Sequence, residues 1–254
     1  MNYISMNLKS QMQYKASFFL TTFGQFVTAF TSFFGLTFIF ERVNAIDDFT
    51  YQEVLLSFAV VVMAFSIGEL FGAGFAVFPR LLGNGEFDRA LVRPRNIIVQ
   101  VLMPNLDFTR LGLLFQSVLV LCYAVPSSGI AWTWDKAVTL CLMILCGGAL
   151  FFSLFLVKAA CSFFTTENLN FMNIFTYGAR QFGKYPFSVY GKGVLHFLTY
   201  VVPLALFQYY PMLYLLGREE SRVNMLTPVI SLLFLIPCYL FFKFGLSRYK
   251  STGS

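Results

Sequence analysis

The charged residues whose spacing suggests a specific task lie in one stretch, residues 84–94, with the sequence NGEFDRALVRP. Its Asn-Gly pair favours a turn, and two acids then precede two arginines, which is the order that a helix dipole prefers. Pro94 ends the helix. Phe87 and Leu91 are four residues apart and share one helix face. The spacing predicts a short surface helix with an apolar ridge, suited either to docking on a partner or to resting on lipid headgroups.

Residues for catalysis or metal binding are sparse. The chain has a single histidine, His196, which we interpret as an interfacial histidine rather than a proton relay. Its five cysteines lie in apolar stretches without a CxxC pair and are Cys122, Cys141, Cys146, Cys161 and Cys238. Small packing residues are expected there, not a disulfide framework or a zinc site. No P-loop, GxSxG or HExxH pattern occurs, so we expect no catalytic residue, no metal site and no ATPase in this chain.

The composition decides the class of protein. Of 254 residues, 57% are hydrophobic and only 12% are charged, whereas a soluble domain carries roughly 25% charged residues. The 33 phenylalanines indicate a lipid-facing surface. These values exclude a soluble enzyme. The basic balance of 18 Lys and Arg against 12 Asp and Glu is attributed to membrane topology rather than to nucleic-acid binding.

Six apolar stretches are long enough to cross a bilayer, which takes about 20 residues of helix. They are residues 16–40, 54–78, 111–134, 137–160, 193–217 and 223–243. The expected fold class is an all-α integral membrane protein with six transmembrane helices. The first stretch follows fifteen rather polar residues and lacks a cleavage site, so it is expected to be a retained span and not a signal peptide.

Charge distribution predicts how these spans are oriented. With six spans, both termini lie on one side, and most cations fall on that side. The exceptions are Arg42, Lys136, Arg218 and Arg222. Because cationic connections stay inside the cell, both termini are predicted to be cytoplasmic, as are the connections 79–110 and 158–192.

Polar and small residues inside the spans have two interpretations each. Glu69 lies about 22 Å from the outer end of the second span, where facing lipid would cost about 3 kcal/mol. We favour a buried strut that bonds to a Ser, Thr or Tyr over a substrate-path or gating residue. Gly68 and Gly72 allow another backbone to approach closely. We favour packing within the chain over a contact between two copies.

Two regions of irregular structure are expected in the second half. Prolines in the last two spans predict kinks, with short re-entrant pieces near 217–224; they are Pro203, Pro211, Pro228 and Pro237. Residues 165–190 alternate apolar and polar residues. They form either an amphipathic helix on the inner leaflet or a continuation of the fourth span.

The stretch GEFDRALVRP resembles the G-x-F/L-D-x-x-L-x-R-P signature of type-two (ABC-2) ABC transporter permeases. Further similar pieces follow in the same order along essentially the whole chain. They are Gly68-Glu69-Leu70, Trp132 and Trp134, Tyr185-Pro186, Leu198-Thr199-Tyr200, Val202-Pro203-Leu204-Ala205, Tyr210-Pro211, Tyr214-Leu215-Leu216-Gly217 and the final Tyr249-x-Ser251-x-Gly253-Ser254.

The resemblance implies the membrane subunit of an ATP-driven exporter in a bacterial cytoplasmic membrane. This permease would pair with an identical or sister permease and with two copies of a separate ATPase, which bind the ATP and Mg; no cofactor is implied in this chain. The loop 79–96 would contact the ATPase as a coupling helix. The implied contact residues are Gly85 for the turn, Phe87 and Leu91 as docking side chains, Asp88 and Arg93 as polar contacts, and Pro94.

The first fifteen residues resemble the interfacial connecting helix of the same family. Ile4, Leu8 and Met12 are spaced four apart among polar residues, so an amphipathic helix at the membrane surface is expected. An undistinguished surface anchor is the other interpretation.

Other functions fit the residues less well. An ion-coupled carrier is expected to show internal repeats and several buried charges, whereas one buried acid and no obvious repeat are found. An intramembrane enzyme would need clustered ligands or acids. A membrane scaffold that transports nothing stays open, and the sequence does not identify a substrate.

Overall fold

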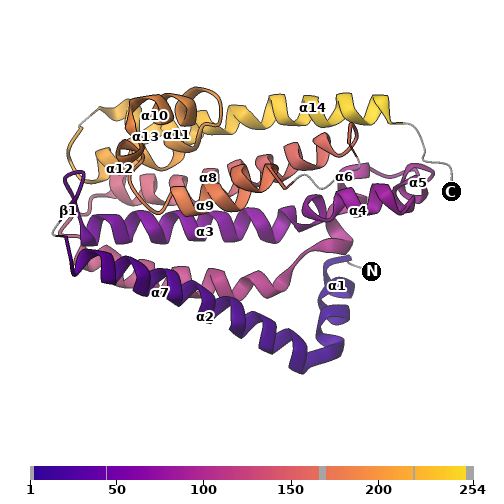
Figure 1. The fold of residues 1–254 in the computed structure, drawn as a ribbon, viewed down its shortest axis with the longest axis horizontal. Helices are drawn as coiled ribbons and strands as arrows, with labels where there is room; N and C mark the ends of the chain where they lie inside the picture. The colour runs from indigo at the N-terminus through magenta and orange to yellow at the C-terminus, as the bar shows by residue number, and fades with distance from the viewer. Residues whose placement is uncertain (1–2, 44, 166–169, 220, 250–254) are drawn as a thin grey trace.

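In the computed structural model, residues 3–43, 45–165, 170–219 and 221–249 are described, and they form a helical bundle with both chain ends toward the same side (Figure 1). Its helices are α1 Tyr3–Gln11, α2 Lys15–Phe40, α3 Tyr51–Ala76, α4 Phe78–Gly83, α5 Glu86–Leu91, α6 Ile97–Leu102, α7 Leu111–Ser127, α8 Trp134–Cys161, α9 Ala179–Phe182, α10 Gly191–Tyr200, α11 Leu204–Phe207, α12 Tyr209–Leu215, α13 Arg222–Ser231 and α14 Leu235–Arg248. Two short antiparallel strands, β1 Ala45–Ile46 and β2 Phe49–Thr50, connect α2 to α3.

The centre of the bundle is the pair α3 and α8. Helix α7 packs on α3, α2 packs on α7, and α14 packs on the opposite side, against α8 (Figure 1). Every residue of α3 from Val54 to Val62 is buried. A helix that is apolar all round suits such a central position or a position in contact with lipid. In α2, by contrast, only Ala29 and Leu36 are buried.

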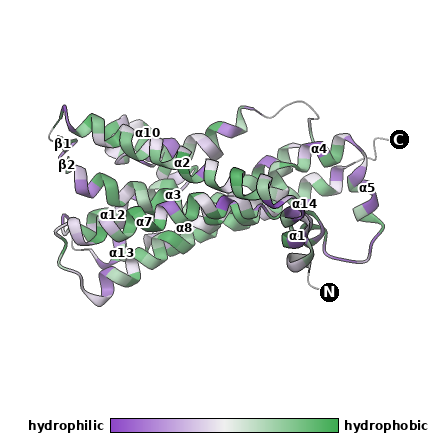
Figure 2. Ribbon diagram, turned by 90° about the horizontal axis from the view of Figure 1, so that it is seen from below, coloured by the Kyte–Doolittle hydropathy of each residue, from purple (hydrophilic) through white to green (hydrophobic). Residues whose placement is uncertain are grey.

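In the described part of the chain, five helices are long and apolar enough to cross a membrane, and a sixth crossing is counted if the bent pair Phe187–Tyr200 and Leu204–Leu215 is one span. Apolar residues dominate the long helices, whereas hydrophilic residues are frequent at the β1–β2 hairpin and at α5 (Figure 2). The prediction of an all-α multi-pass membrane protein is therefore confirmed.

The end of the bundle opposite the termini is fixed by local turn chemistry. Asp47 and Asp48 have φ angles of 49° and 65°, the left-handed values that a two-residue hairpin turn needs. The Thr50 amide then donates to the Glu53 carboxylate at 2.8 Å in a capping box that begins α3. Arg218 donates to the same carboxylate at 2.8 Å, so the α12–α13 connection is held against this hairpin.

The third span is shorter than predicted. Residues 111–134 were expected to form one helix, but α7 ends at Ser127 and α8 begins at Trp134. Pro126 lies in the last turn of α7, and Gly129 turns the chain after it with a φ of 66°. The Trp132 indole N–H donates to the Val125 carbonyl at 3.2 Å, which folds this connection over the end of α7.

The predicted fifth span, 193–217, is not one helix. The helices on either side of residues 201–203 meet at 89°, because Pro203 has no N–H to continue the helix. The break in this span therefore lies at 201–203, whereas the described residues of 217–221 form the connection between α12 and α13. The sixth span is continuous from Arg222 to Arg248, with only a 3-10 turn at Leu232–Phe234 after Pro228.

The described part of 165–190 follows neither predicted course. It runs beside α3 in the opposite direction, because Tyr177 packs on Phe65 with ring centroids 5.6 Å apart, and the later Gly183 carbonyl accepts from Ser57 at 3.4 Å. A π-helical turn at Ile174–Gly178 leads into α9 within this stretch. Arg180 and Lys184 consequently lie along a membrane-spanning helix and not in a surface loop, which corrects the expected extent of the 158–192 connection.

Candidate functional site

The connection between α3 and α7 contains the short helix that the 84–94 pattern predicts. Gly85 has a φ of 68°, a left-handed conformation that glycine adopts without strain. Helix α5 starts directly after it, with two acids in its first turn and Arg89 in its last. This order matches the helix dipole, and Pro94 follows after the end of the helix.

Phe87 holds α5 against the bundle. Its side chain is 1% exposed. Its ring lies 5.0 Å from that of Phe78, 5.8 Å from Phe163 and 5.3 Å from Tyr249, all edge to face. The expectation that this ring docks on a partner is therefore wrong for this conformation. An apolar ring gains more from such a pocket in its own chain than from exposure.

Asp88 adds a polar connection to the same place. The Tyr249 hydroxyl donates to the Asp88 carboxylate at 2.9 Å, so the expected polar contact residue bonds within its own chain. Tyr249 directly follows the last residue of α14. Helix α5 is thus joined to the end of the last helix by one ring contact and one hydrogen bond.

The other predicted contact residues lie on the exposed side of α5 or shortly after its end. Leu91 is 40% exposed and Val92 is 83% exposed. Arg93 and Pro94 are exposed as well. Beside them, a hollow of about 520 Å³ lies between α5 and α6, lined among others by Arg89, Arg93 and Gln100. Apolar and cationic groups are therefore available together on this surface.

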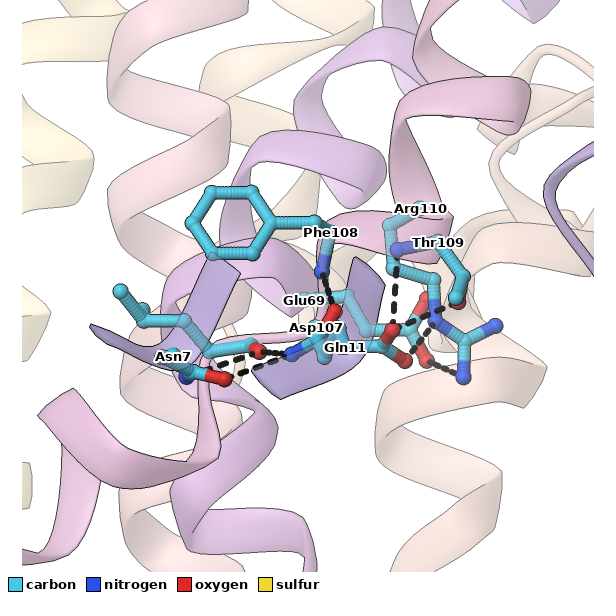
Figure 3. Close-up of polar contacts among 8 residues, drawn as sticks. Asn7, Gln11, Glu69, Asp107, Phe108, Thr109 and Arg110 are labelled. Carbon is cyan, nitrogen blue, oxygen red and sulfur yellow. Dashed lines mark hydrogen bonds and ion pairs between the residues drawn. The ribbon is translucent and has the colours of Figure 1, made fainter. Parts of the chain in front are cut away.

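Glu69 lies in a buried polar cluster near α1 and the start of α7 (Figure 3). Its carboxylate is 3.2 Å from the Arg110 guanidinium, which also lies 3.0 Å from Asp107. Tyr177 and Arg180 interact with Glu69 electrostatically. Both carboxylate oxygens are otherwise buried without a hydrogen-bond partner. The structure therefore supports a strut that is ion-paired to an arginine instead of bonded to the expected Ser, Thr or Tyr. Its main partner, Arg110, was missed because sequence analysis places that residue in a loop.

The polar side of α1 bonds to the connection before α7. The Asn7 amide donates to the carbonyls of Met103 and Leu106 at 3.1 and 3.2 Å. The Phe108 amide donates to the Gln11 side chain at 3.2 Å (Figure 3). Helix α1 is thus attached to the same connection that supplies Arg110.

The glycines of the second span pack within the chain. A Cβ on Gly68 would lie 2.6 Å from that of Phe151, and one on Gly72 would lie 3.0 Å from the Phe155 ring. These are contacts with α8, so the interpretation as internal packing holds. Within the described residues, no group of three or more His, Cys, Asp or Glu side chains is placed to hold a metal.

These observations define a class: a multi-pass helical membrane protein with a short connection helix anchored to the bundle on one side and exposed on the other. A family model described as ABC-2 family transporter protein matches residues 26–253. The chain therefore belongs to the ABC-2 family of transporter proteins. Comparison with curated proteins and with solved structures finds no match.

Proposed function

We propose that this ABC-2 protein is the permease of an ATP-driven exporter and that the α5 region is its contact with a separate ATPase subunit. The observation that carries this proposal is the two-sided nature of α5. Phe87 is 1% exposed, while Leu91, one turn later, is 40% exposed. Because α5 is packed against the bundle on one side and exposed on the other, a force that a partner applies to its exposed side would move the helices it contacts.

The contacts of α5 indicate where such a push would go. Phe87 touches Phe78, which begins α4 directly after α3, and Phe163, which follows the end of α8. Tyr249 adds the end of α14. A displacement of α5 is therefore passed to three long helices at once, because packed aromatic rings do not compress.

A second connection runs through the Glu69 cluster. Arg110 directly precedes α7 and forms an ion pair with Glu69 in the central helix α3. Helix α1 bonds to the same connection through Asn7 and Gln11. We assign this cluster the role of keeping α1, α3 and α7 in register when α5 moves.

The remaining parts of the assembly follow from the family. Two copies of the ATPase bind ATP and Mg, and a second permease, identical or related, completes the pathway. Helix α2 is available for that contact or for lipid, since its phenylalanines Phe19, Phe23, Phe34 and Phe38 are all exposed. The proposed site is the bacterial cytoplasmic membrane, and the proposed direction is outward.

Co-purification tests the ATPase contact. The chain is co-expressed with an ABC ATPase from a neighbouring reading frame, and the double variant Leu91→Ala with Arg93→Ala is compared with the wild type. We expect association to weaken at least tenfold, because both groups are exposed and face outward.

The matched control is Val43→Ala, an exposed apolar residue at the opposite end of the bundle. It should co-purify as the wild type does. Unchanged association of the double variant, with a folded membrane domain, would contradict the proposed contact.

A further inference from the structure

A partly open cavity of about 100 Å³ with several polar lining residues lies between α2, α3 and the stretch around α9. Its wall contains apolar residues of α3 and α7, such as Phe58 and Leu113. The polar groups that line it are Gln25, Thr28, Ser32, Arg180, Gln181 and Lys184. The cavity therefore combines two cations with neutral hydrogen-bonding groups.

Lys184 is buried in this wall without a carboxylate. Lys184 is only 8% exposed. The ammonium donates to the Ser32 hydroxyl at 3.0 Å and to the Gln181 side chain, and it lies 5.7 Å from the centre of the Phe58 ring. Within the described residues, no acid forms an ion pair with it.

Arg180 is also incompletely satisfied. Its guanidinium lies 4.7 Å from the centre of the Phe65 ring, and its Nε is buried without a hydrogen-bond partner. Glu69 interacts with it electrostatically. The same carboxylate, however, is 3.2 Å from Arg110.

Among the described residues, the local charges do not balance. Glu69 and Asp107 supply two negative charges near three cations, Arg110, Arg180 and Lys184. The cavity lies beside α3 at the level of Phe58 and Val62, and these residues belong to a membrane-spanning helix. Unpaired charge at such a depth is rare, and it marks a pathway or a binding site for a counter-ion.

We propose that this cavity binds one anionic oxygen-rich group, a phosphate or a carboxylate, between Arg180 and Lys184. A water occupies about 30 Å³ in the liquid, so the cavity has room for a group the size of a single headgroup phosphate. Ser32 and Gln25 provide further hydrogen bonds. Thr28 and Gln181 are exposed, which leaves the cavity accessible from that side.

Binding by the full chain, purified in a neutral detergent, tests the proposal. The probes are inorganic phosphate, phosphatidic acid and, as a lipid without net charge, phosphatidylcholine. We expect saturable binding of phosphatidic acid or phosphate, and at least tenfold weaker binding by Lys184→Gln and by Arg180→Gln. Lys184→Arg, which keeps the charge, should retain binding.

The matched control is Lys192→Gln, which removes an exposed lysine in α10 and should bind within twofold of the wild type. Binding of phosphatidic acid that phosphate does not compete for identifies a lipid headgroup as the ligand. Competition by phosphate identifies the free anion. Equal binding by the wild type and by Lys184→Gln, or no saturable binding of either anion, overturns the proposal.

Discussion

The hydroxyl of Tyr249 lies 2.9 Å from a carboxylate oxygen of Asp88, so the end of the last helix is bonded to the first long connection of the chain. The Tyr249 ring also packs on Phe87, 5.3 Å between centroids. Neither contact depends on a partner. The position of α5 is therefore set by residues of the permease itself.

Removing this hydroxyl alone should loosen α5. In Tyr249→Phe, the ring contacts stay and one hydrogen bond to a carboxylate is lost, which costs about 1.5–3 kcal/mol locally. We expect faster amide hydrogen exchange in Glu86–Leu91, measured by mass spectrometry. Ser247→Ala, which removes an exposed hydroxyl two residues earlier, should leave that exchange unchanged; equal exchange in the two variants would argue against the bond.

Substitutions at Phe87 and at Leu91 should have different effects, the first on stability and the second on ATPase association. Truncation of a fully buried phenylalanine costs about 3–5 kcal/mol, so Phe87→Ala should lower the melting temperature of the purified protein clearly. Leu91→Ala should change stability by less than about 0.5 kcal/mol, as exposed substitutions do, while weakening ATPase association. Thermal unfolding and co-purification are measured on both variants. A reversed pattern would show that α5 is bound differently in the assembly.

The Glu69–Arg110 pair should contribute more to the stability of the fold than the ion pair at the other end of the bundle. Glu69→Gln removes the carboxylate that faces both Arg110 and Arg180 and leaves Arg110 with Asp107 alone, at a cost of about 3 kcal/mol. Glu53→Gln breaks the more exposed pair with Arg218, and it should cost about 1 kcal/mol or less because solvent screens that pair. Thermal unfolding of the two variants in the same detergent compares them. Similar losses would mean that Glu69 is not a strut.

Gly112 should be intolerant of any side chain. A Cβ there would collide with the Thr22 carbonyl oxygen of α2, so Gly112→Ala must push α2 away from α7. Gly35→Ala, at a position with nothing within 4 Å, is the control and should be neutral. Disulfide cross-linking or electron spin labels on α2 and α7 would report the separation.

The orientation prediction is testable by labelling. In a chain without its native cysteines, Asp48→Cys and Asn84→Cys place single thiols at the two ends of α3. An impermeant maleimide applied to intact cells should label the first and not the second, because cationic connections stay in the cytoplasm. Labelling of Asn84→Cys alone would show that the orientation is the opposite of the predicted one.

Sequence patterns predicted the features that depend on neighbouring residues. The turn at Gly85, the extent of α5 and the inward position of Glu69 follow from local spacing and from the cost of charge in lipid. The first, second, fourth and sixth spans are close to their expected bounds for the same reason. Apolar length alone determines them.

Features that depend on distant residues were not predictable. Phe87 was expected to be free because its partners Phe163 and Tyr249 come much later in the chain. The stretch around Arg180 and Lys184 was expected at the surface because hydropathy counts each charge without the Ser32 and Phe58 that accommodate it. A single sequence does not specify such pairings.

The cations beside α3 also constrain how the polypeptide is made. A lysine or arginine at the centre of a helix costs about 2.5–3.5 kcal/mol when the translocon releases that helix into lipid. Residues 170–190 carry both Arg180 and Lys184, so this stretch does not partition into the bilayer unaided. Its partners Ser32 and Phe58 are synthesised far earlier, on α2 and α3. Retention of these cations in the bilayer therefore requires contacts with the first half of the chain.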